Sequence, residues 1–216
     1  MRLKGAIFDL DGTLLDSMGV WDGAGEKYLA RKGRIPAPGL REILRPMTMA
    51  ETAEYFRKEY GVPGSIEDIC GEINALIEDG YINFLPMKEA AGEFLRKLKE
   101  HGVRMCVATA TDRPLAEGAL RRLGVEGFFR GILTCSETGC GKDRPDIFLK
   151  ALALLGTAME ETVVFEDSLH AIKTAKAAGF KVAAVYDASA DGNREEIRAC
   201  ADWYLGSFNE WVWEEE

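Results

Sequence analysis

The chain has 216 residues, a length that suits one or two domains. Hydrophobic residues make up 47% and charged residues 29%, which is the composition of a globular protein and excludes disordered, collagen-like and low-complexity chains. Thirty-six acidic residues against 27 basic ones give a net charge of −9, so we expect neither nucleic acid nor an anionic membrane as a partner.

The first predicted element is a strand over residues 5–8, a short run that is apolar throughout, as in strands covered on both faces. After it, residues 14–85 contain no convincing strand. This stretch predicts helices over residues 17–32, about 40–45, about 50–59, and 65–79, the last opening with a capping-box pattern. It is far longer than an ordinary connection between parallel strands, so we interpret it as an inserted helical domain.

From residue 87 onward, helical patterns alternate with short apolar runs. The predicted helices cover residues 87–100, 113–123, 146–155 and 168–178. The predicted strands cover residues 103–108, 131–134, 162–165 and 181–185. This order predicts an α/β fold, a Rossmann-like parallel sheet between two layers of helices, with the helical insertion as a cap.

Polar side chains follow the predicted strands at the points where the strands end. Residues 9–13 (DLDGT) follow the first strand, residues 109–111 (TAT) the second, and residues 166–168 (EDS) the fourth, while Lys142 lies in a glycine-rich loop. Ligands of open parallel sheets bind at the carboxyl ends of the strands. We therefore expect acids, hydroxyls and one cation to converge at one edge.

Each of these residues also has a purely structural explanation. Asp167, Ser168 and the two threonines can cap helices, and Lys142 can be a solvated surface lysine. The pentapeptide of residues 9–13 is more specific, because average residue usage produces it by chance on the order of once in a few hundred chains of this size. Its place at the end of the first strand, with the other groups in order behind it, argues against coincidence.

In these four motifs the sequence resembles the haloacid dehalogenase superfamily of phosphohydrolases, over essentially the whole chain. The motifs are residues 9–13, 107–109, Lys142 with 145–148, and 165–168. The insertion resembles the cap of the β-phosphoglucomutase-like branch. The resemblance implies a core of residues 1–15 and 82–216 that holds the catalytic site, and a cap of residues 16–81.

The resemblance implies a Mg²⁺-dependent phosphatase that acts on a small phosphorylated metabolite, a sugar phosphate or similar. Asp9 would be the nucleophile and form an aspartyl-phosphate, and Asp11 would protonate the leaving oxygen and then activate water. Thr109 would donate to a phosphoryl oxygen, and Lys142 would pair with the phosphate and with Asp9. A divalent cation would remove the repulsion between an attacking carboxylate and a dianionic ester.

The same resemblance implies two sets of ligands. The expected metal ligands are Asp9, Asp11 through its backbone carbonyl, Asp167, and Glu166 through water or as an outer partner. The expected substrate and phosphate contacts are Gly12, Thr109, Ala110, Lys142, and the cap residues Met18, Trp21, Arg45 and Thr48. Packing within the cap is the alternative explanation for Met18 and Trp21.

The cap departs from the mutase pattern of that branch. Mutases carry a histidine where this chain has Trp21 and a phosphate-binding arginine where it has Met49, so we expect hydrolysis. A sugar-phosphate mutase is the alternative. A receiver-type phospho-acceptor or a non-catalytic binding protein agrees less well with the intact set of acids. A dehalogenase has no leaving oxygen to protonate, and the presence of Asp11 argues against it.

Hydropathy and cysteine content bear on location. No apolar run approaches the roughly 18 residues that span a bilayer, and the stretch before Asp9 is too short for a signal peptide. The five cysteines are odd in number and scattered, as is typical of reduced thiols in the cytosol. We expect a cytoplasmic protein, and the sequence leaves open whether it is a monomer or a homodimer.

Overall fold

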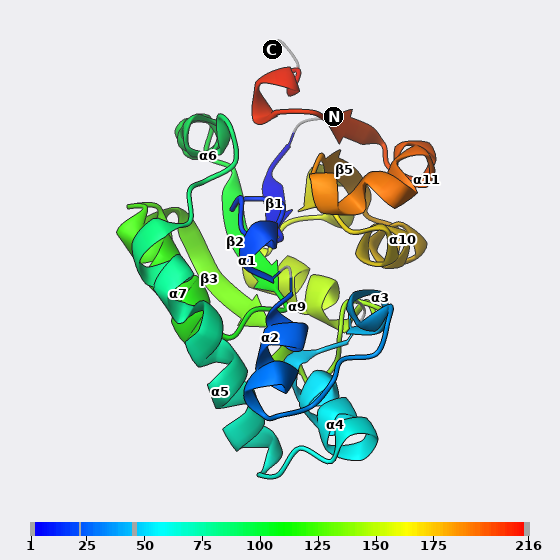
Figure 1. The fold of residues 1–216 in the computed structure, drawn as a ribbon. Coiled ribbons are helices and arrows are strands. Elements are labelled where there is room, and N and C mark those ends of the chain that lie inside the picture. Colours follow the sequence, from blue (N-terminus) through cyan, green and yellow to red (C-terminus); the bar gives the residue numbers. More distant parts are fainter. Residues whose placement is uncertain (1–2, 22, 45–46, 214–216) are drawn as a thin grey trace.

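The computed structural model describes residues 3–21, 23–44 and 47–213 and contains a parallel sheet with a helical insertion (Figure 1). The sheet has six strands in the order β3-β2-β1-β4-β5-β6, all parallel. The strands are β1 (Gly5–Phe8), β2 (Arg104–Thr109), β3 (Phe129–Thr134), β4 (Thr162–Glu166), β5 (Lys181–Val185) and β6 (Trp203–Leu205). The predicted α/β fold is confirmed, and β6 is a strand that the sequence did not predict.

Alternating residues of the central strands supply the two faces of the sheet. Ala6 and Phe8 pack on one face, while Ile7 packs on the other. The first face is covered by α6 (Ala91–Glu100) and α7 (Arg113–Arg122). The second face is covered by α9 (Asp146–Leu155), α10 (Leu169–Ala177) and α11 (Arg194–Cys200). Apolar residues at every strand position are therefore needed, which explains why the strands are recognisable as continuous apolar runs.

The chain between β1 and β2 forms the helical insertion. Its helices are α1 (Met18–Trp21), α2 (Ala24–Arg31), α3 (Leu40–Leu44), α4 (Met49–Tyr60), α5 (Ile66–Asp79) and the π-helix η1 (Gly80–Phe84). The insertion has an apolar core of its own, in which Tyr28, Phe56 and Ile69 are buried. The predicted helical cap is thus confirmed, whereas its bounds of residues 16–81 stay a prediction. Arg122 of α7 donates to the backbone carbonyl of Tyr81 at 3.1 Å, so the insertion returns to the core near that residue.

Several predicted helices have different bounds in the structure. The predicted helix over residues 17–32 is two helices, and Gly23 between them has a φ of 72°, which the left-handed region allows at little cost for glycine. α6 begins at Ala91, not at residue 87. Short elements complete the chain: η2 (Glu126–Phe128), α8 (Cys135–Thr138), η3 (Met159–Glu161), η4 (Ala188–Asn193) and η5 (Phe208–Glu210). None of the described helices has the length and hydropathy that a bilayer crossing requires.

Strand order determines where ligands can reach the sheet. Phe8, the last residue of β1, pairs with Val107 of β2 and with Phe165 of β4. β2 and β3 lie on one side of β1, and β4, β5 and β6 lie on the other side. The direction in which successive strands are added therefore reverses between β1 and β4. Ligands of such sheets bind at the carboxyl ends of the strands beside this reversal. Asp9 lies there and donates its backbone N–H to the Phe165 carbonyl at 2.9 Å.

Two capping boxes fix helix starts in the insertion. The predicted box at Ser65 is present, with the Asp68 N–H donating to the Ser65 hydroxyl at 3.1 Å. A second box begins α4, where the Glu51 N–H donates to the Thr48 hydroxyl at 3.2 Å. The Glu51 carboxylate accepts from the Thr48 N–H at 2.7 Å and from the Thr48 hydroxyl at 2.8 Å. The backbone N–H and the hydroxyl group of Thr48 are therefore both hydrogen-bonded to Glu51 within the insertion.

We predict that Thr48→Ala lowers the free energy of unfolding by about 1 kcal/mol, because the substitution removes an N-cap acceptor at a buried helix start. Thr48→Ser keeps the hydroxyl and should retain most of that stability. Urea denaturation of the three proteins measures the difference. Equal losses of unfolding free energy in both variants would show that the threonine methyl group, and not the N-cap hydrogen bond of α4, provides the stability.

Candidate active site

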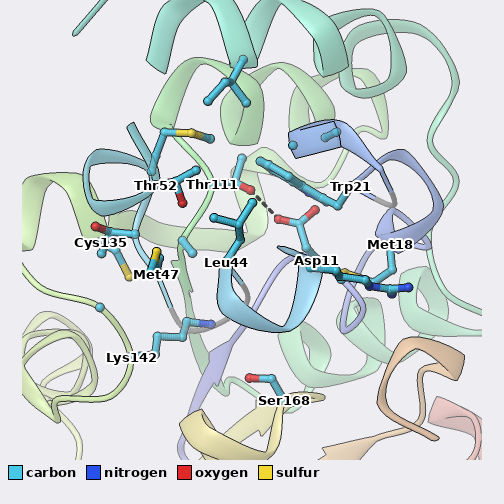
Figure 2. A pocket seen from close by; sticks show the side chains of 18 of the residues that line it. Asp11, Met18, Trp21, Leu44, Met47, Thr52, Thr111, Cys135, Lys142 and Ser168 are labelled. Atoms are coloured by element: carbon cyan, nitrogen blue, oxygen red, sulfur yellow. Dashed lines mark hydrogen bonds between the residues drawn. The ribbon is translucent and has the colours of Figure 1, made fainter. Parts of the chain in front are cut away.

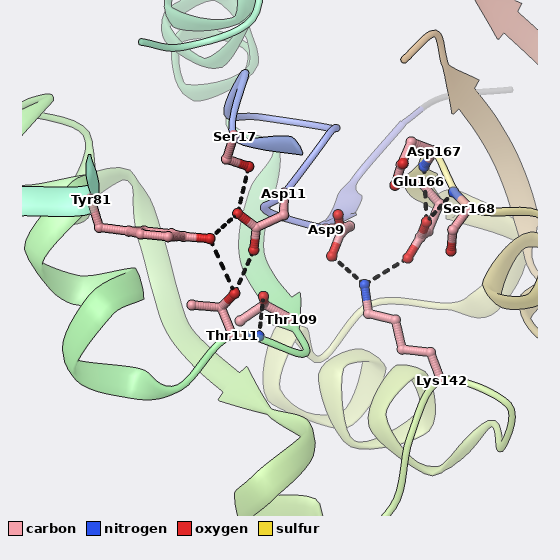
Figure 3. Close-up of polar contacts among 10 residues, drawn as sticks. All are labelled: Asp9, Asp11, Ser17, Tyr81, Thr109, Thr111, Lys142, Glu166, Asp167 and Ser168. Carbon is pink, nitrogen blue, oxygen red and sulfur yellow. Dashed lines mark hydrogen bonds and ion pairs between the residues drawn. The ribbon is translucent and has the colours of Figure 1, made fainter. Parts of the chain in front are cut away.

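The centre of the site is a buried chain of three charged groups at the carboxyl ends of β1 and β4. The Lys142 ammonium donates to the Asp9 carboxylate and, at 2.6 Å, to Glu166 (Figure 3). The other Glu166 oxygen accepts from the backbone N–H groups of Asp167 and Ser168, each at 2.8 Å. The side chains of Asp9 and Lys142 are 8% and 6% exposed. The sequence analysis left open that Lys142 is a solvated surface lysine, and its burial in the structure excludes this.

Burial and charge act on these groups in opposite directions. Burial raises the pKa of Asp9 to about 7 although Lys142 opposes this, and it raises the pKa of Asp167 well above its usual range with help from the charges of Glu166 and Asp9. Burial also acts against the charge of Lys142, but Asp9 and Glu166 outweigh it and the pKa of Lys142 rises. The Lys142 ion pair outweighs burial at Glu166 and lowers its pKa. Three buried carboxyl groups thus lie beside a single ammonium group, and a cation next to them would favour their charged forms.

The chemistry of the donors fits a hard divalent cation. One carboxylate oxygen from each of Asp9, Glu166 and Asp167 lies within 4.8 Å of the other two, and all three residues are buried. Oxygen-only donor sets suit Mg²⁺ and Ca²⁺. Because both oxygens of Glu166 already accept hydrogen bonds, Asp9 and Asp167 are the better placed direct ligands. This grouping agrees with the expected metal site, whereas the proposed contribution of the Asp11 carbonyl stays a prediction.

The Asp11 side chain is held apart from this triad by a cluster of hydroxyl groups. One Asp11 oxygen accepts from Ser17 at 2.6 Å and from Tyr81, and the other accepts from Thr111 at 2.5 Å. The indole N–H of Trp21 in turn donates to the Tyr81 oxygen at 2.6 Å. Figure 3 shows the Asp11 carboxylate turned toward these hydroxyls. Ser17 and Tyr81 lie at the two ends of the insertion, so both ends contact the same carboxylate.

Sequence reasoning missed most of this cluster. Thr111 was interpreted as a helix cap, but the residue at the N-cap of α7 is Asp112. Nothing in the sequence marks Tyr81, which is 70 positions away from Asp11. Ser17 offered a weak signal as a polar residue between the first motif and a helix, and the structure shows it fully buried.

The remaining expected phosphate contacts have different positions. Ala110 lines the cavity described below, whereas Thr109 is fully buried and accepts from the Thr111 N–H at 3.0 Å. Gly12 has a φ of +79°, and a Cβ there would lie 2.7 Å from a carboxylate oxygen of Asp167. Glycine at this position therefore lets the first motif approach the acid triad closely. The phosphate-binding roles of Gly12 and Thr109 stay predictions.

A cavity of about 240 Å³ lies between these polar groups and the insertion (Figure 2). Of the expected cap contacts, Met18, Trp21 and Thr48 line it, and Arg45 lies outside the described residues. The lining also includes His170, the second residue of α10. The cavity thus joins the acid triad to cap side chains, as a site that binds both a phosphate and an organic group requires.

Comparison with known proteins places this site in a family. The haloacid dehalogenase-like hydrolase family matches residues 3–179. The chain belongs to this family. The chain is 31% identical over 222 residues to the bifunctional riboflavin kinase/FMN phosphatase of Arabidopsis thaliana, and it spans 95% of its own length but 57% of that relative's. It is 30% identical over 196 residues to hexitol phosphatase A of Escherichia coli (strain K12), covering 90% of this chain and 88% of that one.

Solved structures of this family have the same architecture. CbbY from Rhodobacter sphaeroides in complex with phosphate superimposes with a TM-score of 0.84 at 26% identity, over 97% of this chain and 96% of CbbY. A CbbY mutant in complex with xylulose-(1,5)bisphosphate superimposes with a TM-score of 0.83 at 25% identity over the same shares of the chains. Together with the relatives, these matches identify the chain as a haloacid dehalogenase-like phosphatase, a phosphoric monoester hydrolase.

We predict that Tyr81→Phe lowers the free energy of unfolding of this phosphatase by about 1–3 kcal/mol. The substitution removes a hydrogen bond to a carboxylate and leaves the Trp21 N–H without its acceptor. Tyr204→Phe, at a half-buried tyrosine of β6 that is not part of this cluster, is the matched control. Urea denaturation measures both. A Tyr81→Phe protein as stable as the control would contradict the arrangement around Asp11.

Proposed function

We propose that the chain is a Mg²⁺-dependent phosphatase that hydrolyses a small phosphorylated metabolite through an aspartyl-phosphate on Asp9. The observation that carries the proposal is the buried Asp9 carboxylate, which pairs with the Lys142 ammonium, belongs to the acid triad and lines the cavity. A nucleophile of this kind needs nearby positive charge to approach an anionic ester. The names of relatives such as hexitol phosphatase A support sugar phosphates as one class of substrate.

In the first step, an Asp9 oxygen forms a bond to phosphorus while the bond between phosphorus and the ester oxygen breaks. Asp11 donates its proton to the departing oxygen, which leaves as an alcohol. Lys142 stays paired with Asp9 and stabilises the charge that develops on the phosphoryl oxygens. Asp9 and Asp167 would hold a divalent cation, whose positive charge would offset the repulsion between carboxylate and phosphate.

In the second step, water attacks the phosphorus of the aspartyl-phosphate and the bond to the Asp9 oxygen breaks. Asp11 accepts the proton from this water, so each residue returns to its starting state when inorganic phosphate leaves. The Asp11 carboxylate must turn from its hydroxyl partners toward the phosphorus during the cycle, because Ser17, Tyr81 and Thr111 hold it in the structure.

Hydrolysis, as opposed to phosphoryl transfer between sugars, is supported by the cap. Transfer requires the enzyme to hold a second phosphate against the cap and to exclude water. The cavity presents the apolar side chains of Trp21 and Met49 at the two positions where mutases of the branch carry a histidine and an arginine. The described cap lining therefore favours water as the acceptor.

We predict that Asp9→Asn lowers phosphate release on the order of a thousandfold or more, because the amide is a poor nucleophile toward phosphorus. Release is measured with Mg²⁺ over sugar phosphates, polyol phosphates, nucleotides and an aryl phosphate. Asp79→Asn, at an exposed carboxylate of α5 that does not line the cavity, is the matched control. An Asp9→Asn protein that turns over at the wild-type rate would rule out the aspartyl-phosphate.

We predict that a chelator abolishes phosphate release and that Mg²⁺ restores it. Asp167→Asn should weaken Mg²⁺ binding about 10–100-fold, because one charged oxygen of the buried triad is lost. Isothermal titration with Mg²⁺ measures the affinity independently of turnover, with Asp191→Asn as an exposed control. Unchanged affinity in Asp167→Asn would place the cation elsewhere.

A further inference from the structure

We infer that the cap cavity selects phosphate esters of apolar alcohols, such as those of small hydrocarbon rings, over esters of polyhydroxylated sugars. This inference rests on the proposed function and deepens it. It concerns the part of the cavity beyond the acid triad, where the alcohol part of the substrate would lie. The names of several relatives point to sugars, whereas the side chains of this chain point to a different class.

Apolar side chains form most of the cap wall of the cavity. Those that line it from the cap include Met18, Trp21, Leu44, Met47, Met49 and Ile73. Figure 2 shows Leu44, Met47, Trp21 and Met18 around the space that opens between Asp11 and Lys142. The six residues come from the four helices α1, α3, α4 and α5 and from the connection before α4, so the apolar wall is not a single stripe.

Two of the polar cap residues that the sequence analysis assigned to the substrate, Trp21 and Thr48, already use their donor groups within the protein, and the third, Arg45, lies outside the described residues. The Trp21 indole N–H donates to Tyr81 at 2.6 Å, which leaves the carbon atoms of its ring for the cavity. The Thr48 hydroxyl donates to Glu51 at 2.8 Å and accepts from the Glu51 N–H. Neither group has its donor hydrogen left for a substrate hydroxyl.

Three further polar side chains of the described cap residues line the cavity, namely Glu26, Arg41 and Thr52. Arg41 is exposed and already has an interaction partner, and Glu26 is half-buried. A hexitol or hexose phosphate carries a hydroxyl group on nearly every carbon, and each hydroxyl both donates and accepts. Among the described cap residues these three polar side chains are too few to pair with every hydroxyl group of such a ring. Hydroxyl groups that lose water without gaining a partner weaken binding.

An apolar ring avoids that penalty and gains from burial against the methionine, leucine and tryptophan side chains. Met18, Met47 and Met49 are also unbranched and adaptable, so they can pack around rings of different shape. The phosphate end would still be bound by the charged cluster, which is common to any ester. Selection therefore depends on the cap, and catalysis depends on the core.

A matched pair of substrates tests the inference on the full chain with Mg²⁺. Cyclohexylmethyl phosphate and glucose 6-phosphate are both esters of a CH₂OH group on a six-membered ring, and they differ in the ring hydroxyls and the ring oxygen. Glucose has the more acidic leaving group, so intrinsic reactivity favours the sugar. We expect kcat/KM to be at least about tenfold higher for cyclohexylmethyl phosphate. A ratio of one or below would overturn the inference.

Substitutions in and after α3 test whether the cap wall causes the selectivity. Leu44→Gln places an amide on the cavity wall and should lower the ratio of the two kcat/KM values about tenfold. Ile43→Gln, at a neighbouring residue that is 38% exposed and does not line the cavity, should leave the ratio unchanged. Because a ratio is independent of the fraction of folded enzyme, partial unfolding does not affect it. Met47→Gln provides a second measurement at a different point of the wall.

The possible failures are distinguishable. If both wall variants keep the wild-type ratio, or if Ile43→Gln changes it equally, the cap wall does not select the alcohol and the inference is wrong. Acetyl phosphate, which places almost nothing against the cap, serves as the reference donor. If the paired esters, acetyl phosphate and every ester of the wider screen described above all fail to release phosphate, the proposed function itself fails and this inference fails with it.

Discussion

The site depends on burying Asp9, Lys142 and Glu166 together. Each of these charges would be costly alone away from water, and the ion pairs of Lys142 with the two acids stabilise all three. The pairing of β1 with β4 brings the two acids to adjacent strand ends, and the loop after α8 must carry Lys142 to the point between them. The same arrangement that makes the burial tolerable also places positive charge where a phosphoryl group would meet its nucleophile. Folding and chemistry thus impose the same requirement on Lys142.

A second constraint lies at the junction of the insertion and the core. Ser17 and Tyr81 stand at opposite ends of the inserted chain, and Thr111 belongs to the core, yet all three donate to Asp11. The orientation of this carboxylate therefore depends on how the insertion meets the sheet. A phosphatase would benefit from such a link, because Asp11, the residue that we propose protonates the leaving oxygen, would then respond to whether the cap is in place over the substrate.

The sequence predicted the sheet and the charged cluster for a physical reason. Buried parallel strands are apolar at every position, and the polar residues that interrupt them, such as Asp9 and Glu166, mark the strand ends. Prediction from the sequence failed where the position of a side chain depends on packing between distant segments. Tyr81 reaches Asp11 only through the path of the insertion, and Thr111 was misread because a threonine before a helix is usually a cap. β6 has three residues, too few to show a periodic pattern, and the break at Gly23 within a continuous helical pattern depends on one backbone angle.

The division between core and cap also explains why motifs indicate a reaction more readily than a substrate. Core side chains have positions set by strand pairing, so a short motif is enough to place the Asp9 carboxylate. Cap side chains have roles set by what their neighbours already bind. Trp21 and Thr48 were reasonable substrate contacts by residue type, but Tyr81 and Glu51 take up their hydrogen-bonding groups, and what remains toward the cavity is carbon. A polar residue in a binding wall contributes polarity only if its donors and acceptors are unpaired, which a sequence does not reveal and a hydrogen-bond network does.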